Sequence, residues 1–363
     1  MEVNEKNVSE MAPEMVSETA VDAVSTKSQR KVATAIGWRY AVFAVVVILV
    51  QTLLLNIIAL VNEAFYMEHA ISLNFLSIVL GVDCIGFPLL LLLGKGMEKT
   101  KIEKRKMSFG KLILSVLLMA GLAGVGTSVG TVIHLALTLP FGVEGAEANA
   151  VATLMLESGF FLRVLVVGIL APIVEELIFR KLLIDRVVKH GEFLAIALSA
   201  LMFGLFHGNF SQFFMATLIG GLFAFIYIRT GKVWYTIFLH MAMNLTTSVV
   251  TVWLAGYYMD AAMELAMAKT EEQMVTAMTE NILPLGAYLG WLGILGLIAF
   301  VGFILFWVFF KKFRLTDKAR GIKAGSSMAA AYGNWGFVLF LLVCLFLFGM
   351  NYIPNIVMWI MSL

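Results

Sequence analysis

The sequence predicts an all-α membrane protein, a polytopic bundle of about nine transmembrane helices. Hydrophobic residues make up 61% of the 363 positions and charged residues only 14%, whereas soluble globular domains contain roughly 45–50% and about 25%. The mean hydropathy is +0.92. These values exclude a soluble domain and a disordered chain. The net charge of +2 gives no reason to expect a nucleic-acid partner.

Nine apolar runs define the predicted helices, because each is close to the ~20 residues that a helix needs to cross a bilayer. The fifth and sixth runs are short, and the polar turn 208–212 joins them, so a tilted or incomplete hairpin is expected there. The runs lie near residues 40–61, 71–94, 112–139, 159–179, 193–208, 213–228, 233–255, 286–310 and 334–353.

The segments outside these runs complete the predicted organisation. Residues 1–35 are rich in Glu, Ser and Thr and hold no apolar run, so we expect a disordered acidic tail. The Met-rich stretch 258–278 is amphipathic and is expected to be an interfacial helix or a lid-like cover. The predicted parts are the tail 1–35, spans one to three (36–158), a core of spans four to seven (159–255), an extracytoplasmic connection (256–285) and spans eight and nine (286–363).

Basic residues indicate how the chain is oriented in the membrane. With nine spans, all but two of the 26 Lys and Arg residues fall on one side, and the exceptions are Arg163 and Lys269. Because basic connections stay in the cytoplasm, we predict the N-terminus inside and the C-terminus outside. The expected location is a plasma membrane, which we take to be bacterial.

Small residues recur in two of the runs at a spacing typical of close helix packing. We therefore expect neighbouring helices to approach these faces. The residues are Gly126 and Gly130 in the third run, and Gly286, Gly290, Gly293 and Gly296 in the eighth.

Ionisable side chains inside apolar runs need a specific reason, because each costs about 2.5–3.5 kcal/mol or more to insert. The fourth run holds two adjacent carboxylates, Glu175 and Glu176. Glu176 and Arg180 are four residues apart and can pair on one helix face. Glu175 then points about 100° away and is free for another task. Pro172 lacks a backbone N–H, so it is expected to expose the carbonyl of Gly168 and to kink the helix.

Two further runs carry polar groups that complement the free carboxylate. His207 ends the fifth run, and His240 and Asn244 lie one turn apart in the seventh. A carboxylate, two imidazoles and an amide can activate water and stabilise an oxyanion. His207 can reach the others only if its helix tilts or begins outside the hydrocarbon. Asp83 and His134 also lie in apolar runs, and two roles stay open for them: they join the same cavity, or they pair with each other.

These residues resemble the motifs of the CPBP family, the CAAX proteases and bacteriocin-processing enzymes once called the Abi family. The family pattern is EExxxR, then FxxxH, then HxxxN, on successive hydrophobic segments. The resemblance covers about residues 165–250, and the ordered triple is more specific than any single part. Here the parts read Glu175-Glu176-x-x-x-Arg180, Phe203-x-x-x-His207 and His240-x-x-x-Asn244.

The resemblance implies an intramembrane endopeptidase with a helical-bundle fold. Carried over to this sequence, Glu175 and His207 would activate water. His240 and Asn244 would hold the oxyanion. The other motif residues, which would complete or shape the site, are Glu176, Arg180 and Phe203.

A metal is the open question that the resemblance leaves. The family has been described both as glutamate proteases and as metalloproteases. If a divalent metal binds, with zinc the first expectation, its ligands would be Glu175, His207 and His240, which match a three-ligand catalytic site. The neutral amide of Asn244 suits an oxyanion better than a metal, which favours the metal-free version.

Two other functions compete with the protease. The intramembrane ionisable groups could form a proton relay in an ion-coupled transporter, although no repeat and no paired broken helices support it. The chain could also be a non-enzymatic immunity or regulatory scaffold that keeps the motif. As a protease, its partners would be the lipid bilayer and a peptide or membrane-anchored protein presented near the cytoplasmic side. The oligomeric state stays open.

Overall fold

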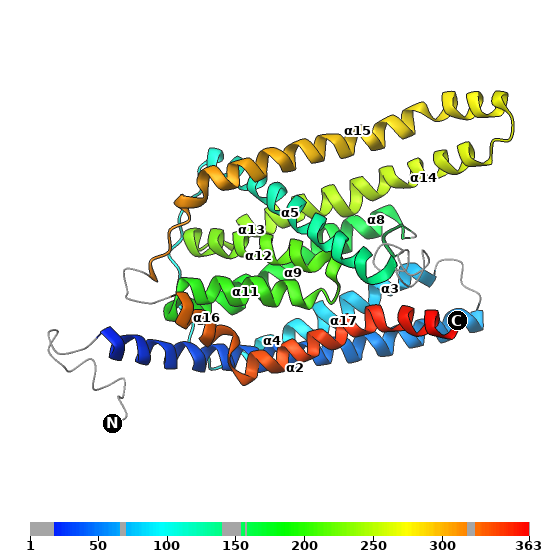
Figure 1. Ribbon diagram of the computed structural model, residues 1–363. Coiled ribbons are helices and arrows are strands. Elements are labelled where there is room, and N and C mark those ends of the chain that lie inside the picture. Colours follow the sequence, from blue (N-terminus) through cyan, green and yellow to red (C-terminus); the bar gives the residue numbers. More distant parts are fainter. Residues whose placement is uncertain (1–17, 66–69, 140–153, 157, 318–323, 363) are drawn as a thin grey trace.

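The computed structural model describes residues 18–65, 70–139, 154–156, 158–317 and 324–362, and this part of the chain is helical without a β-strand (Figure 1). All nine apolar runs fall in helices, so the predicted all-α class is confirmed. The five longest helices are α2 (Glu18–Phe65), α5 (Phe109–Thr138), α12 (Phe210–Thr230), α15 (Glu271–Phe309) and α17 (Trp335–Ser362).

Three of the four remaining apolar runs, the second, the fourth and the seventh, lie in rods in which α-helical and π-helical turns alternate. The second run comprises α3 (Ala70–Ile78), η1 (Val79–Gly86) and α4 (Phe87–Leu93). The rods that contain the fourth and seventh runs follow the same plan, and π turns are frequent at functional sites. The fourth run comprises α8 (Phe160–Leu162), η3 (Arg163–Leu170), α9 (Ala171–Glu176), η4 (Leu177–Leu182) and α10 (Leu183–Val187), and the seventh comprises α13 (Val233–Asn244), η6 (Leu245–Val250) and α14 (Thr251–Met267).

Seven of the described helical segments are long and apolar enough to cross a membrane. The fifth run forms the shorter apolar helix α11 (Glu192–Phe206). The fourth run is helical but carries its motif charges. The chain is therefore a multi-pass integral membrane protein, whereas the count of nine spans and the orientation of the termini stay predictions.

The helices pack in three layers, and the motif helices form the middle one (Figure 1). On one side α17 packs along α2, next to the rod of residues 70–93. On the other side α5 lies between α12 and α15, and α15 also packs along α14. The middle layer comprises α9, α10, α11, α12 and α13. Large aromatic side chains with at most 1% exposure fill it, among them Phe179, Phe203, Phe223 and Tyr227.

The structure differs from the predicted tail at the N-terminal end. Residues 1–17 lie outside the described residues, but α2 begins at Glu18, so 18–35 are helical rather than disordered. The reason is tertiary packing, because α2 contacts the short helix α16 (Ala324–Tyr332). Gln29 is 1% exposed, and its side chain bonds Ser327 and the carbonyl of His190.

The Met-rich stretch is not a separate interfacial helix. Its first part ends α14 and its second part begins α15, and the two helices form a hairpin that extends beyond the other helices (Figure 1). A capping box fixes the start of α15, in which the Thr270 hydroxyl accepts from the N–H of Gln273.

The glycine prediction holds for α5 and is wrong for α15. A Cβ on Gly126 would lie 2.4 Å from the Cα of Met215, and one on Gly130 would lie 2.5 Å from the carbonyl oxygen of Phe210. These contacts show that α12 packs closely on α5. At Gly286, Gly290, Gly293 and Gly296 no described atom would lie within 4 Å of an added Cβ.

Candidate active site

The two motif carboxylates lie next to each other on α9 but in different environments. Glu176 is fully buried and pairs with Arg180, also fully buried, whose Nε and Nη2 each lie 3.0 Å from a carboxylate oxygen. Arg180 Nη1 also donates to the hydroxyl of Ser199 at 3.1 Å. The side chain of Glu175 is 22% exposed. The prediction that Arg180 binds Glu176 and leaves Glu175 free is confirmed.

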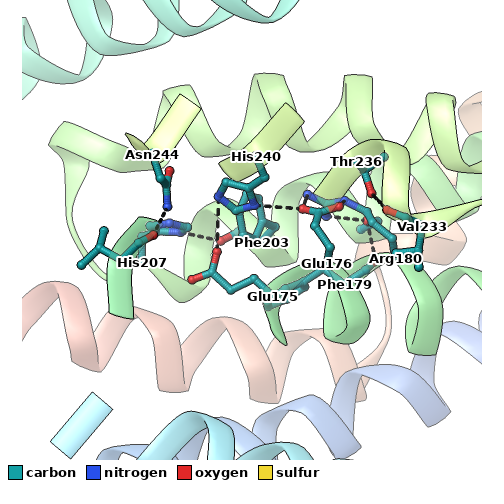
Figure 2. Close-up of polar contacts among 12 residues, drawn as sticks. Glu175, Glu176, Phe179, Arg180, Phe203, His207, Val233, Thr236, His240 and Asn244 are labelled. Atoms are coloured by element: carbon teal, nitrogen blue, oxygen red, sulfur yellow. Dashed lines mark hydrogen bonds and ion pairs between the residues drawn. The ribbon is translucent and has the colours of Figure 1, made fainter. Parts of the chain in front are cut away.

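His240 lies between these carboxylates and contacts both of them (Figure 2). Its Nδ1 is 3.2 Å from Glu176 Oε1, and its Nε2 is 3.6 Å from Glu175 Oε2. The ring is 5% exposed, and the aromatic ring of Phe203 meets it edge to face at 5.7 Å between centroids. Four polar groups, from Arg180 to Glu175, thus form one connected chain across α9, η4 and α13.

Asn244 lies one turn beyond His240 and is fixed by a backbone carbonyl that the π turn releases. Its Nδ2 donates to the carbonyl of Val167 at 2.9 Å. In η3 the pairing is i to i−5, as the bond from the N–H of Ala171 to the carbonyl of Val166 shows. The next donor in that register would be Pro172, which has no N–H. The released carbonyl is therefore that of Val167, whereas the sequence prediction, which assumed an α-helical register, placed it one residue later at Gly168.

His207 caps the end of α11, and its orientation is set by its own helix. Its Nδ1 lies 2.9 Å from the carbonyl oxygen of Phe203. A carbonyl can only accept, so Nδ1 carries a proton, and in the neutral imidazole Nε2 then keeps its lone pair. In Figure 2 the carboxylate of Glu175 points toward the region between His207 and His240, and its charge acts on His207.

Phe203 joins the parts of the site through its ring. The guanidinium carbon of Arg180 lies 4.6 Å from the ring centroid. The imidazole of His207 meets the ring edge to face at 4.9 Å between centroids. Phe203 therefore shields the buried ion pair from the more open part of the site, where Glu175 lies.

The structure brings all seven predicted site residues together and adds partners that the motifs did not indicate. Ser199 relays a bond from Arg180 to the carbonyl of Phe179, and its hydroxyl donates at 2.8 Å. Thr236 is fully buried beside Glu176, one turn before His240, and its hydroxyl donates to the carbonyl of Val233 at 2.9 Å. The sequence could have indicated Thr236, because it is a polar residue in an apolar run and lies four positions before the motif residue His240.

The two residues whose roles were left open lie in different places. Asp83, in η1, is within electrostatic range of Glu175. His134, in α5, has its Nδ1 3.1 Å from the hydroxyl of Tyr352 in α17. The suggestion that Asp83 and His134 pair with each other therefore finds no support, since His134 has another partner.

The residues present do not form a metal-binding group in this arrangement. Within the described ranges, no three His, Cys, Asp or Glu side chains are grouped to hold an ion. Both imidazoles use Nδ1 for a protein contact, with Phe203 in one case and Glu176 in the other, which leaves Nε2 of each ring as the atom that could bind a metal. A zinc site at Glu175, His207 and His240 stays a prediction that would need these side chains to rearrange.

Comparisons with known proteins place the motif segment in a family. Residues 157–246 match the family model described as "Type II CAAX prenyl endopeptidase Rce1-like". The chain is also 35% identical over 105 residues to the Bacillus subtilis (strain 168) protein named "Putative membrane peptidase YdiL", which is 29% of this chain and 43% of that protein. The chain thus matches less than half the length of this relative. No solved structure matches. The resemblance drawn from the motifs is confirmed, since residues 157–246 match a model of CAAX proteases and the chain is similar to a protein named as a membrane peptidase.

Proposed function

We propose that the chain is an intramembrane endopeptidase that hydrolyses a peptide bond with water activated by Glu175 and His207. The observation that carries this proposal is the division between the two carboxylates. Arg180 holds Glu176 in a fully buried ion pair, while Glu175 is partly exposed beside two imidazoles. The ion pair with Arg180 needs only Glu176. Packing therefore does not explain why Glu175, a second carboxylate, lies in an apolar helix, where an ionisable group costs free energy.

The contacts of each side chain fit the steps of hydrolysis. Glu175 and the lone pair on His207 Nε2 can take the proton from a water molecule as its oxygen attacks the carbonyl carbon. The C–N bond then breaks, and the same base returns the proton to the leaving amine. Asn244 uses one amide hydrogen on Val167, which fixes the side chain and leaves its second hydrogen for the oxyanion.

Glu176 has a distinct task in this scheme, which is to make His240 a hydrogen-bond donor. A carboxylate at Nδ1 favours a proton on that nitrogen. An oxyanion donor also needs a proton on Nε2, and only the imidazolium carries both. The carboxylates on either side of the ring compensate that positive charge. Arg180 in turn keeps Glu176 ionised and oriented.

The proposed substrate is a peptide or a membrane-anchored protein presented near the cytoplasmic side. The family model names prenylated CAAX substrates, in which a lipid is attached to a Cys near the C-terminus. A lipid anchor would hold the cleavage site close to a membrane-embedded base, so such a substrate fits the location of the site.

The test is proteolysis by the purified protein in lipid nanodiscs. The probes are a quenched fluorescent CAAX peptide with a prenylated Cys and the same peptide without the lipid. Glu175→Gln and His207→Ala should each lower kcat roughly 10²–10⁴-fold, the usual contribution of general acid–base catalysis. Glu272→Gln, an exposed acid near the start of α15, is the matched control and should retain wild-type rates.

Two outcomes would overturn the proposal. One is cleavage of neither probe by the wild type, and the other is equal cleavage by the Glu175→Gln variant. Retention of cellular function in that variant would favour a binding scaffold instead. The same assay with a chelator, followed by zinc, tests the metal: restored cleavage after zinc addition would show a metallopeptidase.

A further inference from the structure

The turn that follows His207 is held by the C-terminal helix α17, which lies outside the family-matched segment. Asn351 donates from Nδ2 to the carbonyl of Gly208 at 3.0 Å. The hydroxyl of Tyr352 accepts from the N–H of Phe210 at 3.1 Å. The same hydroxyl lies 3.1 Å from Nδ1 of His134 on α5.

These two bonds go to backbone groups that the turn cannot satisfy by itself. The ends of helices leave unpaired N–H and C=O groups. Because α11 ends at Phe206 and α12 begins at Phe210, both helix ends leave such groups in this turn. Inside the turn, Asn209 donates to the carbonyl of His207 at 2.9 Å and accepts from the N–H of Gln212 at 3.0 Å. The Gly208 carbonyl and the Phe210 N–H receive their side-chain partners from α17.

Packing on both sides restricts the turn further. Gly208 has φ +66°, and a Cβ there would lie 2.9 Å from Cβ of Leu347 on α17. The ring of Phe210 contacts that of Phe348, with 4.7 Å between the centroids and 60° between the ring planes. On the opposite side, an added Cβ on Gly130 of α5 would lie 2.5 Å from the carbonyl oxygen of Phe210. The turn therefore lies between α5 and α17 with no free space toward either.

We propose that Asn351 and Tyr352 are positioning residues, which set the location of the His207 imidazole by holding the turn that bears it. The inference rests on the proposed function of His207. The imidazole is fixed to the carbonyl of Phe203 within its own helix, so its place relative to Glu175 follows from the place of the helix end. The hydroxyl of Tyr352 links that helix end to α5 as well. A segment outside the motifs thus determines the geometry of the reacting groups.

The consequence is a specific kinetic defect. A displacement of about 1 Å in a reacting group can cost on the order of 10²-fold in rate. The described contacts of Asn351 and Tyr352 are with the turn, with α5 and within α17, and not with the motif side chains. Substrate binding should therefore change little. We expect kcat to fall roughly 10- to 100-fold when the two bonds are removed, with KM within about twofold.

The test uses variants that remove the bonds and keep the shape. Asn351→Leu removes the donor to Gly208, and Tyr352→Phe removes only the hydroxyl and keeps the ring. The matched control for Asn351→Leu is Asn56→Leu. The Asn56 amide donates to the carbonyl four residues earlier in α2, as the Asn351 amide also does in α17. The matched control for Tyr352→Phe is Tyr257→Phe, since Tyr257 is 52% exposed. Each protein is measured for kcat and KM on the prenylated peptide and for thermal unfolding.

A second readout does not depend on activity. The chain has five His residues, and selective isotope labelling, with His207→Gln for assignment, gives an NMR signal for the His207 ring. Asn351→Leu and Tyr352→Phe should shift this signal, and the two controls should leave it unchanged. If the wild type cleaves no peptide but the α17 variants still shift the His207 signal, the positioning role is supported and only the proposed function fails.

Two results would overturn the inference. In the first, both α17 variants keep the wild-type kcat and the wild-type His207 signal. In the second, their loss of activity matches the loss of folded protein and the His207 signal of the folded fraction is unchanged, which is what a purely structural role produces.

Discussion

The ion pair between Arg180 and Glu176 has no exposed surface, and we predict that removing the arginine alone destabilises the protein strongly. In Arg180→Met the apolar stem is largely kept and the guanidinium is lost. The Glu176 carboxylate then stays buried without its cation, and Ser199 loses a partner at 3.1 Å. Breaking a buried pair in this way costs about 3–5 kcal/mol, whereas an exposed pair contributes about 0–1 kcal/mol.

The double variant Glu176→Gln with Arg180→Met separates the charge from the packing. Removal of both charges leaves no uncompensated ion, and such replacements are often neutral or stabilising. We therefore expect the double variant to be more stable than Arg180→Met alone, which a double-mutant cycle reports as a coupling energy of about 2–3 kcal/mol. Peptidase activity should be lost in the double variant, since Glu176→Gln leaves His240 without a carboxylate at Nδ1, and should fall in Arg180→Met, since Arg180 no longer orients that carboxylate.

Thermal unfolding in detergent, followed by circular dichroism, measures the effect. At roughly 2 °C for each kcal/mol in a chain of this size, Arg180→Met should lower Tm by roughly 6–10 °C. The control is Arg105→Met, because Arg105 pairs with Glu103 while their side chains are 66% and 73% exposed; it should lower Tm by no more than about 2 °C. A Tm for Arg180→Met within that range, or a double variant less stable than the single one, would refute the reasoning.

Two further predictions concern backbone positions around the site. Gly204→Ala should destabilise the fold by about 1–3 kcal/mol or more, because the added Cβ would lie 2.0 Å from the Thr217 hydroxyl oxygen. The control Gly221→Ala, whose Cβ would have its nearest neighbour 3.8 Å away, should be neutral or slightly stabilising. Equal Tm values for the two variants would contradict this prediction. Pro172→Ala supplies an N–H that can bond the Val167 carbonyl in place of the Asn244 amide. We therefore expect kcat to fall roughly tenfold with KM nearly constant. An unchanged kcat on the prenylated peptide would show that the Val167 carbonyl does not position the Asn244 amide.

The sequence by itself determined the features that depend on local chemistry. Hydropathy fixed the class, because a run of about 20 apolar residues has a single stable form in lipid, a helix with its own hydrogen bonds satisfied. The pairing of Arg180 with Glu176 followed from the period of one helix, and so did the freedom of Glu175. The ordered motifs on successive runs also indicated the family.

The tertiary structure decided what depends on register and on the contacts between distant segments. A π turn moved the released carbonyl from Gly168 to Val167, because one extra residue in the hydrogen-bonded ring shifts every later pairing. Packing against α16 made residues 18–35 of the predicted tail helical, and the predicted packing glycines of α15, Gly286, Gly290, Gly293 and Gly296, met no neighbour. His207 reaches the site because α17 and α5 hold the turn behind it. Such contacts join residues 80 or more positions apart, so no periodicity along the chain encodes them.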